Sequence, residues 1–236
     1  LCSQNLPDAA IIDGTDNFNT VLWTGNGSDG RSITGVGFDP DFVWIKSRNL
    51  TTSHLLNDTI RGANKSLFSE GTTAETASNG GGYLSAFVTD GFSVTSGSSG
   101  DDAVNDSSDT YVAWNWLAGT AFSNDASATS VGTIDSSGQV NTTAGFSIVS
   151  YTGNSSTDGQ TVAHGLSSAP EMVIIKNRSN ARNWRTYHSA LGATKYINLD
   201  ETAAAATYGS FNDTAPTSTV FSTTDSDADR ATNYNS

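Results

Sequence analysis

The sequence predicts an all-β protein made of two tandem antiparallel β-sandwich domains of jelly-roll-like type, related by an internal duplication. Short apolar segments recur at intervals of roughly 8 to 12 residues and are separated by Gly, Asn, Asp and Ser, which is typical of sandwiches. Gly, Ser, Thr, Asn and Asp are abundant while Lys, Glu and Leu are scarce, a composition that favours turns and strands over long helices. A parallel β-helix, the structural competitor, would need a short repeat of about 20 residues, and neither half shows one.

Two segments, 21–76 and 149–206, carry the duplication and align with only a small insertion. All four lysines of the chain fall at matching positions. The matched pairs are Lys46 and Lys176, Lys65 and Lys195, Arg48 and Arg178, Pro40 and Pro170, and Gly62 and Gly192. Each copy is too long for a solenoid unit, so we expect each to form a domain with its own core.

The expected strands are short, rich in β-branched and aromatic residues, and bounded by turn-forming residues. In the first copy they cover 20–25, 40–46, 65–69, 83–90 and 109–117, and in the second copy 146–153, 171–177, 195–199 and 218–223. The runs 42–45 and 172–175 are continuously apolar, which predicts central strands covered on both faces, with Trp44 and Ile174 in the interior or at an interface. Only residues 201–208 have a helical pattern, enough for one or two turns.

These elements divide the chain into four parts. Residues 1–18 are an N-terminal connector, 19–118 the first sandwich and 146–236 the second. Residues 119–145 are polar and form a link, with one possible strand around Val131 to Ile134. The second copy stops before its own version of the strand 109–117, with Ser236 aligned roughly with Asp106. We therefore expect the polypeptide to continue past Ser236 or a neighbouring chain to supply a strand, unless 126–145 cover the edge beside Val220 and Phe221.

The charge of the chain excludes several partners. A net charge of −13 and a pI near 4.3 argue against binding nucleic acid, which requires clustered Lys and Arg, and against docking on an anionic membrane. No apolar run approaches the roughly 20 residues of a membrane span, and no secretory signal opens the chain. The lone Cys2 can form neither an intramolecular disulfide nor a cysteine-rich metal site.

Residues capable of chemistry are present without a recognisable catalytic arrangement. His54, His164 and His188 lack the close spacing of a metal pair, and no G-x-S-x-G elbow accompanies the many serines. Glycoside cleavage needs two carboxylates across a sugar site, and the four glutamates Glu70, Glu75, Glu171 and Glu201 leave that alternative open. We predict no catalytic, cofactor-binding or metal-binding residues and no cofactor.

Two acidic loops leave a weak calcium site as a second alternative. Asp225, Asp227 and Asp229 have the spacing of an EF-hand start, but Arg230 replaces the required glycine and Ser236 the bidentate Glu. The corresponding loop of the first copy carries Asp101, Asp102, Asp106 and Asp109. Solvated acidic loops are the simpler interpretation.

The two basic pairs, Lys46 with Arg48 and Lys176 with Arg178, end the central strands. We expect them to meet acidic loops of their own domain, such as Asp58 or Glu70. A subunit contact or an anionic-glycan site is the functional alternative.

The strings VLWTGNGS, RSITGVGFDPDFVWIKSRN, IRGANKSLFS and DTYVAWNWLAG resemble a repeat module of tailed-phage virion structural proteins, especially marine and cyanobacterial ones. NTTAGFSIVSYTGN, HGLSSAPEMVIIKNRS and LGATKYINLD are similar to its companion half. The resemblance implies an extracellular virion protein, in a tail fibre, spike or surface appendage, that acts as a scaffold or host-glycan adhesin. It implies other virion proteins as partners and a homo-oligomer, with a trimer favoured, and it transfers no catalytic residue.

Two alternatives to the appendage remain open: a capsid decoration or cement protein, and a tailspike-type polysaccharide depolymerase. Aromatic residues are enriched in interface cores, so some of four tryptophans are expected between subunits. These are Trp23, Trp114, Trp116 and Trp184.

Overall fold

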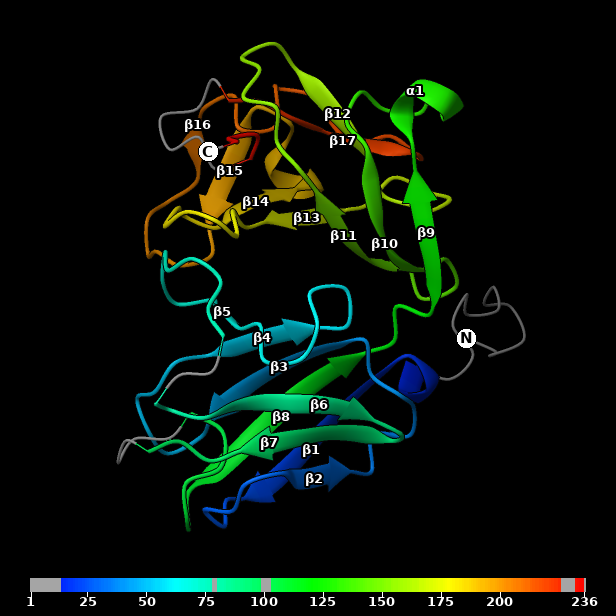
Figure 1. Ribbon diagram of the computed structural model, residues 1–236. Coiled ribbons are helices and arrows are strands. Elements are labelled where there is room, and N and C mark those ends of the chain that lie inside the picture. The colour runs from blue at the N-terminus through cyan, green and yellow to red at the C-terminus, as the bar shows by residue number, and fades with distance from the viewer. Residues whose placement is uncertain (1–13, 78–79, 99–102, 226–231, 236) are drawn as a thin grey trace, which may run out of the picture.

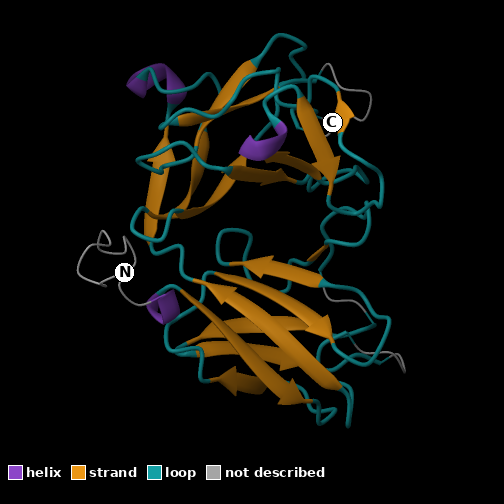
Figure 2. Cartoon of the chain, turned by 180° about the vertical axis from the view of Figure 1, so that it is seen from behind, coloured by secondary structure: helices purple, strands orange, loops and turns teal. Residues whose placement is uncertain are grey.

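The structure, a computed structural model, describes residues 14–77, 80–98, 103–225 and 232–235. Antiparallel sheets make up nearly all of the regular structure, so the all-β sandwich prediction is confirmed. Figures 1 and 2 show two β-rich halves stacked on one another, the first ending after β8 and the second beginning at β9.

The first half is a sandwich of two sheets. Its larger sheet has the order β1-β8-β3-β4-β5 and its smaller sheet the order β2-β7-β6. The strands are β1 (Phe18–Thr24), β2 (Arg31–Thr34), β3 (Phe42–Ser47), β4 (Leu55–Asp58), β5 (Leu67–Phe68), β6 (Tyr83–Val88), β7 (Gly91–Thr95) and β8 (Thr110–Trp116), preceded by a 3-10 turn at Gly14–Asp16. Val43, Ile45 and Tyr111 from one sheet meet Leu84 and Phe92 from the other in a fully buried core.

Strand β8 is an interior strand of the larger sheet, between β1 and β3. It pairs antiparallel with β1, from Phe18↔Trp116 to Thr24↔Thr110, and with β3, from Phe42↔Trp116 to Ser47↔Tyr111. Its inward residues Tyr111, Ala113 and Asn115 are fully buried, whereas the bulkier outward residues are half-buried. The small Ala113 fits between Val21 and Ile45, its register partners on the two neighbouring strands.

The second half consists of three smaller sheets. Their orders are β11-β10-β9, β12-β17 and β13-β14-β15-β16. The strands are β9 (Thr120–Asn124), β10 (Ser136–Asn141), β11 (Phe146–Tyr151), β12 (Gln160–Ala163), β13 (Met172–Ile175), β14 (Arg185–His188), β15 (Lys195–Asn198), β16 (Ala206–Thr207) and β17 (Val220–Thr223), with a short helix α1 (Ala126–Thr129) and a 3-10 turn at Ser189–Leu191. Val162, Ile175, Tyr187, Phe211 and Phe221 form its core.

Two local expectations differ from the structure. Residues 119–145, expected to be a link with a strand near Val131, contain β9, α1 and β10, and β10 pairs with β11 along its whole length. Asp125 fixes the start of α1 because its side chain accepts hydrogen bonds from the Ser127 and Ala128 N–H groups. The helix expected at 201–208 is wrong. Its alanine run lacks an apolar stripe, and Ala206–Thr207 instead pairs with β15 as β16.

The halves share their strand registers. In β3 and β4 the pairs run from Phe42↔Asp58 to Ile45↔Leu55, and in β13 and β14 from Met172↔His188 to Ile175↔Arg185. Each residue of the second set lies 130 positions after its counterpart in the first, the offset that also separates the matched lysines. This agreement is consistent with the duplication, which stays a prediction.

The central apolar strands differ in how well they are covered. Trp44 on β3 is half-buried, as expected, and packs against a cluster of Leu56, Leu67 and Trp184 between the halves. Ile174 on β13 is 39% exposed and so does not lie in the interior, and its place at an interface stays a prediction. The outer face of β3 is covered by the second half, whereas the outer face of β13 stays accessible at Met172 and Ile174.

An apolar cluster joins the halves. Leu56 and Leu67 of the first half bury the indole of Trp184, whose Nε1 donates to the carbonyls of Phe68 at 2.8 Å and Gly71 at 3.1 Å. A second contact stacks Phe146 on Trp116, with ring centroids 5.9 Å apart. Four tryptophans were expected between subunits. Trp23 and Trp184 are buried within this chain, and Trp114 and Trp116 are half-buried.

Asp41 fixes the passage from one half to the other. Its carboxylate accepts hydrogen bonds from Ala118 N at 2.9 Å and Gly119 N at 2.7 Å, where the chain leaves β8. It also accepts from Gln139 Nε2 at 3.0 Å and Thr59 Oγ1 at 3.2 Å. Because the side chain is almost fully buried, both oxygens depend on these donors for their solvation.

Replacing Asp41 by Asn should destabilise the protein by about 1–3 kcal/mol, because an amide presents one acceptor oxygen and would turn its NH2 toward donors. Urea unfolding of Asp41→Asn and of a control, Asp29→Asn at an exposed position, measures the effect. Equal unfolding midpoints for the two variants would show that Asp41 does not fix the connection.

Candidate functional site

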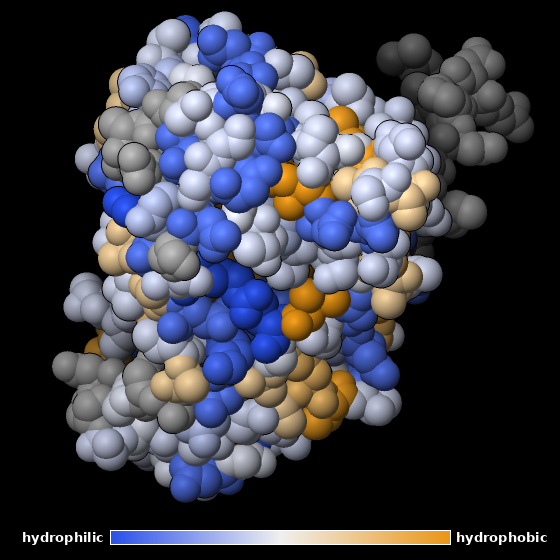
Figure 3. All heavy atoms as spheres, turned by 45° about the horizontal axis from the view of Figure 1, so that its top comes forward, coloured by the Kyte–Doolittle hydropathy of each residue, from blue (hydrophilic) through white to orange (hydrophobic). Residues whose placement is uncertain are grey.

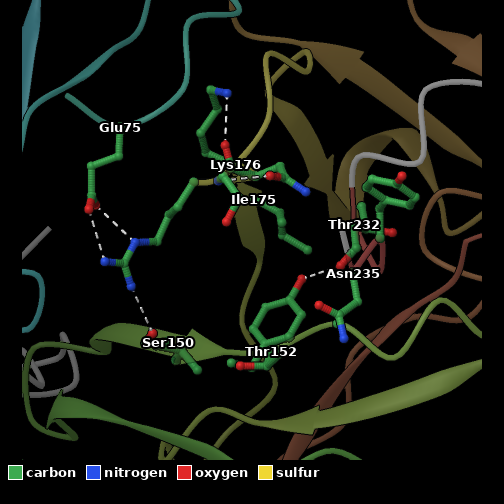
Figure 4. A pocket seen from close by; sticks show the side chains of 14 residues that line it. Glu75, Ser150, Thr152, Ile175, Lys176, Thr232 and Asn235 are labelled. Atoms are coloured by element: carbon green, nitrogen blue, oxygen red, sulfur yellow. Dashed lines mark hydrogen bonds and ion pairs between the residues drawn. The ribbon is translucent and has the colours of Figure 1, made fainter.

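The most distinctive site is a cleft between β11 and β13, here called the strand slot. Within the described residues β11 pairs only with β10, and β13 only with β14, so no strand connects their facing edges. The cleft has a volume of about 430 Å³. Its two long walls are formed by Val149, Ser150 and Tyr151 on one side and by Ile175, Lys176 and Asn177 on the other. Figure 4 shows Glu75 beyond one side of it and Thr232 and Asn235 at the other.

The same place in the first half is filled by β8. There β1 and β3, the counterparts of β11 and β13, lie on either side of β8 and pair with it. Val21 and Trp23 of β1 are consequently buried, whereas Val149 and Tyr151 of β11 are half-buried. The strand slot is thus the place in the second half that corresponds to β8.

One asparagine side chain holds the backbone beside β8, and a second one does the same beside the strand slot. Asn105 Nδ2 donates to Asn26 Oδ1 at 3.0 Å and to Ser28 O at 2.8 Å, just before β8. Asn233 makes the same two bonds, at 2.8 Å to Asn154 Oδ1 and 3.0 Å to Ser156 O. By this contact Asn233, and not Asn235, is the counterpart of Asn105, so Ser236 corresponds to Ser108, two positions from the rough alignment with Asp106. The repeated tripeptides Asn26-Gly-Ser28 and Asn154-Ser-Ser156 were the sequence signal for this anchor.

An ion pair closes one side of the slot. Arg178 Nε and Nη2 donate to the Glu75 carboxylate at 2.9 and 3.0 Å, and Nη1 reaches Ser150 Oγ at 3.4 Å. Burial opposes ionisation of Glu75, but the hydrogen bonds and charges of Arg178 and Arg61 outweigh it and hold the Glu75 pKa below its ordinary value. The hydrogen bond to Glu75 raises the pKa of Arg178 in turn. Arg178 therefore joins the two halves, and the expected contact with Asp58 or Glu70 is replaced by one with Glu75.

The lysines of the basic pairs donate hydrogen bonds to backbone carbonyls. Lys176 Nζ donates to Thr72 O at 3.0 Å and Asn177 O at 2.9 Å, and Lys46 Nζ donates to Leu50 O at 2.8 Å. Burial lowers the pKa of Lys176 to about 8, against the opposing charge of Asp200. Lys176 thus places a titratable ammonium group on the wall of the slot.

A second, more open groove lies where the halves meet. Trp44 and Leu199 give it apolar surface, and Glu70, Asp200 and Glu201 give it carboxylates. An aromatic face beside hydrogen-bond acceptors can bind a sugar ring and its hydroxyl groups. We call this the Trp44 groove.

The histidines considered from the sequence are not brought together. His54 lines the Trp44 groove, and burial lowers its pKa, with Glu70 acting in the opposite direction and Lys46 in the same one. His164 is buried and bonded to Thr217 O and Leu166 N. His188 is exposed and accepts from Ala190 N.

The carboxylates fall into separate places as well. Glu70 and Glu201 share the Trp44 groove, Glu75 lies at the strand slot, and Glu171 accepts a hydrogen bond from Ser189 Oγ. Among the residues that the structure describes, no three His, Cys, Asp or Glu side chains group as metal ligands. Asp101, Asp102, Asp227 and Asp229 of the acidic loops lie outside the described residues.

A family model described as "Domain of unknown function (DUF7483)" matches residues 13–236. The chain belongs to that family. No curated protein and no solved structure matches the chain. The DUF7483 match spans both halves and covers the residues of this chain that line the strand slot and the Trp44 groove. In the described part of this domain, no helix is long and apolar enough to cross a membrane.

Glu75→Gln should reduce stability at pH 7 by up to about 1 kcal/mol, a modest figure because Arg178 is 43% exposed and its charge is screened. Since the folded-state pKa of Glu75 is depressed, its contribution is present above the unfolded pKa and is lost as the pH falls through the folded value. The difference between the parent and Glu75→Gln should therefore vanish in acid. Unfolding curves from pH 7 to pH 3, with exposed Asp158→Asn as control, test this, and a constant difference across that range would contradict it.

Proposed function

We propose that this protein is a non-catalytic structural module of a tailed-phage virion, located in a tail fibre, spike or other exposed appendage. The resemblance of its repeat motifs to such modules is the starting point. The observation that carries the proposal is the strand slot, which the described residues leave open between β11 and β13, whereas β8 fills its counterpart in the first half. An open strand position indicates a β-module that is completed by one further strand, which would bind through its backbone along its whole length.

The joint between the halves also supports a structural role. The Trp184 cluster, the Asp41 hydrogen bonds and the Glu75–Arg178 pair tie the two sandwiches together at three separate places. A unit joined in this way transmits load between its ends without bending at a linker. We propose that its partners are other virion proteins and copies of itself, with a trimer favoured.

The surface is compatible with an exposed position. On the face seen in Figure 3, hydrophilic residues predominate and hydrophobic ones occur in small groups. The exposed large apolar side chains among the described residues are Phe18, Leu22, Met172, Ile174 and Tyr208. Phe18 and Leu22 both lie on the edge strand β1, a place where a neighbouring subunit could cover them.

Immunoelectron microscopy of intact particles, with an antibody raised against this chain, tests the proposal. Label at the tail is the expected result. Label spread over the capsid shell would contradict the appendage and support the decoration protein. Absence of label from purified particles that retain all their structural proteins would contradict both.

The Trp44 groove favours a second candidate, an adhesin that binds a neutral host glycan. Its exposed aromatic surface and three carboxylates provide the stacking face and hydroxyl acceptors that such ligands use. Glu70 and Glu201 in the same groove keep the depolymerase alternative testable, since cleavage uses two carboxylates.

Trp44→Ala should weaken binding to a host polysaccharide by about tenfold or more, because stacking on the indole would be lost. Tyr208→Ala, which removes an exposed aromatic side chain outside the groove, is the matched control. Pull-down on immobilised polysaccharide measures binding, and a reducing-sugar assay run alongside detects cleavage. Equal retention of both variants and the parent would exclude the groove, and sugar release abolished by Glu70→Gln would indicate a depolymerase.

A further inference from the structure

We propose that the strand slot is an acceptor for one β-strand, the segment that follows the Asn233 turn as β8 follows the Asn105 turn. The proposal is independent of where the protein is located, since it rests on the correspondence between the halves. With the slot filled, β10, β11, the added strand, β13 and β14 would form one continuous sheet. Neither the sequence match to the family nor the proposed virion role assigns this site.

The walls of the slot reproduce the neighbours of β8. In the first half Ala113 lies between Val21 and Ile45. The counterparts of those two residues, Val149 and Ile175, face each other across the slot. The position of Val112, between Leu22 and Lys46, corresponds in the same way to the space between Ser150 and Lys176. Both positions give one register for the absent strand, as consecutive residues of the same two wall strands must.

Three residues of β11 and β13 are less buried than their counterparts in the first half, although Ile175 is buried as Ile45 is. Val21 and Trp23 are buried beside β8, and Val43 of β3 is fully buried. Their counterparts Val149, Tyr151 and Val173 are all half-buried. A strand laid between β11 and β13 would cover these side chains and pair the facing backbone edges.

The occupant can be described by its chemistry. At the place of Ala113 it needs a small residue, because Val149 and Ile175 close in from both sides. At the place of Tyr111, which stacks on Trp23 with centroids 5.3 Å apart, an aromatic residue would pack beside Tyr151. A strand with the alternation of β8 therefore fits the slot.

The path of the chain sets the direction of entry. Asp106 N donates to the Tyr111 hydroxyl, so the Asn105 turn leads directly into β8. Asn233 holds the corresponding turn, and Thr232, Tyr234 and Asn235 line one end of the slot. A segment following this turn enters the slot in the orientation of β8, antiparallel to both β11 and β13. The direction of entry follows from the geometry of the Asn233 turn.

The experiment appends a copy of residues 109–118 directly after Ser236, which the Asn105–Asn233 correspondence places in register with the slot. Amide hydrogen exchange is compared among the 236-residue chain, the fusion, and a control fusion carrying Val112→Pro and Ala113→Pro in the appended copy only. Proline cannot donate to the ladder, so the control has the same length but cannot pair. The amides of β1 and β3 serve as an internal reference in every sample.

The expected result is slower exchange by about tenfold or more in 146–151 and 172–175 of the fusion, with the control fusion unchanged from the 236-residue chain. No difference between the two fusions would overturn the proposal. Full protection by the free peptide of residues 109–118, with none on fusion, would also overturn it, because a strand would then be donated by another chain. Altered exchange in β1 and β3 would count against it too, since the added copy would be displacing β8.

Discussion

The pairing of β8 on both of its edges is the interaction on which the first half depends. A buried backbone must satisfy its N–H and C=O groups, and a central strand does so only with a neighbour on each side. β8 meets that requirement against β1 and β3 over its full length. Its small inward residue Ala113 also lets Val21 and Ile45 approach the core, which explains why both are buried. The second half repeats the flanking strands around a slot, where Val149 and Tyr151 are less buried than Val21 and Trp23 while Ile175 is buried.

The outer face of the same sheet determines how the halves meet. Phe42, Trp44 and Trp116 point away from the first core and present an aromatic surface. Phe146 packs on that surface, and Trp184 packs beside it on Leu56 and Leu67. Burying this surface offsets the exposure of large aromatic side chains that a lone first half would present to water. The Trp44 groove lies at the margin of this contact, where covering is incomplete.

Much of the fold could be predicted from local patterns. The apolar run 42–45, bounded by Pro40 and Asp41 and followed by Lys46, predicted a central strand, and the matched lysines predicted the shared register of β3–β4 and β13–β14. β9 and β10 could not be found in this way, because most of their residues are small or polar, and β10 pairs through its backbone with β9 on one side and β11 on the other. Gly138 illustrates the constraint: a Cβ there would lie 1.9 Å from Ile148 O, so close approach rather than hydrophobicity selects the residue. The alanine run at 201–208 led to a wrong helix prediction, because good helix propensity without an apolar face does not stabilise a helix.

The candidate site was less predictable than the fold. The partner of Arg178 is Glu75, a residue 103 positions away in the loop of the other half, and no spacing rule connects them. The slot itself was foreseen as a missing strand, but its walls, its register and its anchor at Asn233 required the three-dimensional arrangement of β11 and β13. Beside Val220 and Phe221, β17 pairs with β12 on one edge, and in the described residues 126–145 form no strand pairing with it.

The central claim, that β11 and β13 flank a vacant strand position, is tested most directly by amide hydrogen exchange of the 236-residue chain alone. The account predicts that the amides of β11 and β13 that do not bond to β10 or β14 exchange much faster than the amides through which β1 and β3 pair with β8. Protection of those slot-facing amides equal to that in β1 and β3 would show that the position is already filled, and would contradict the account.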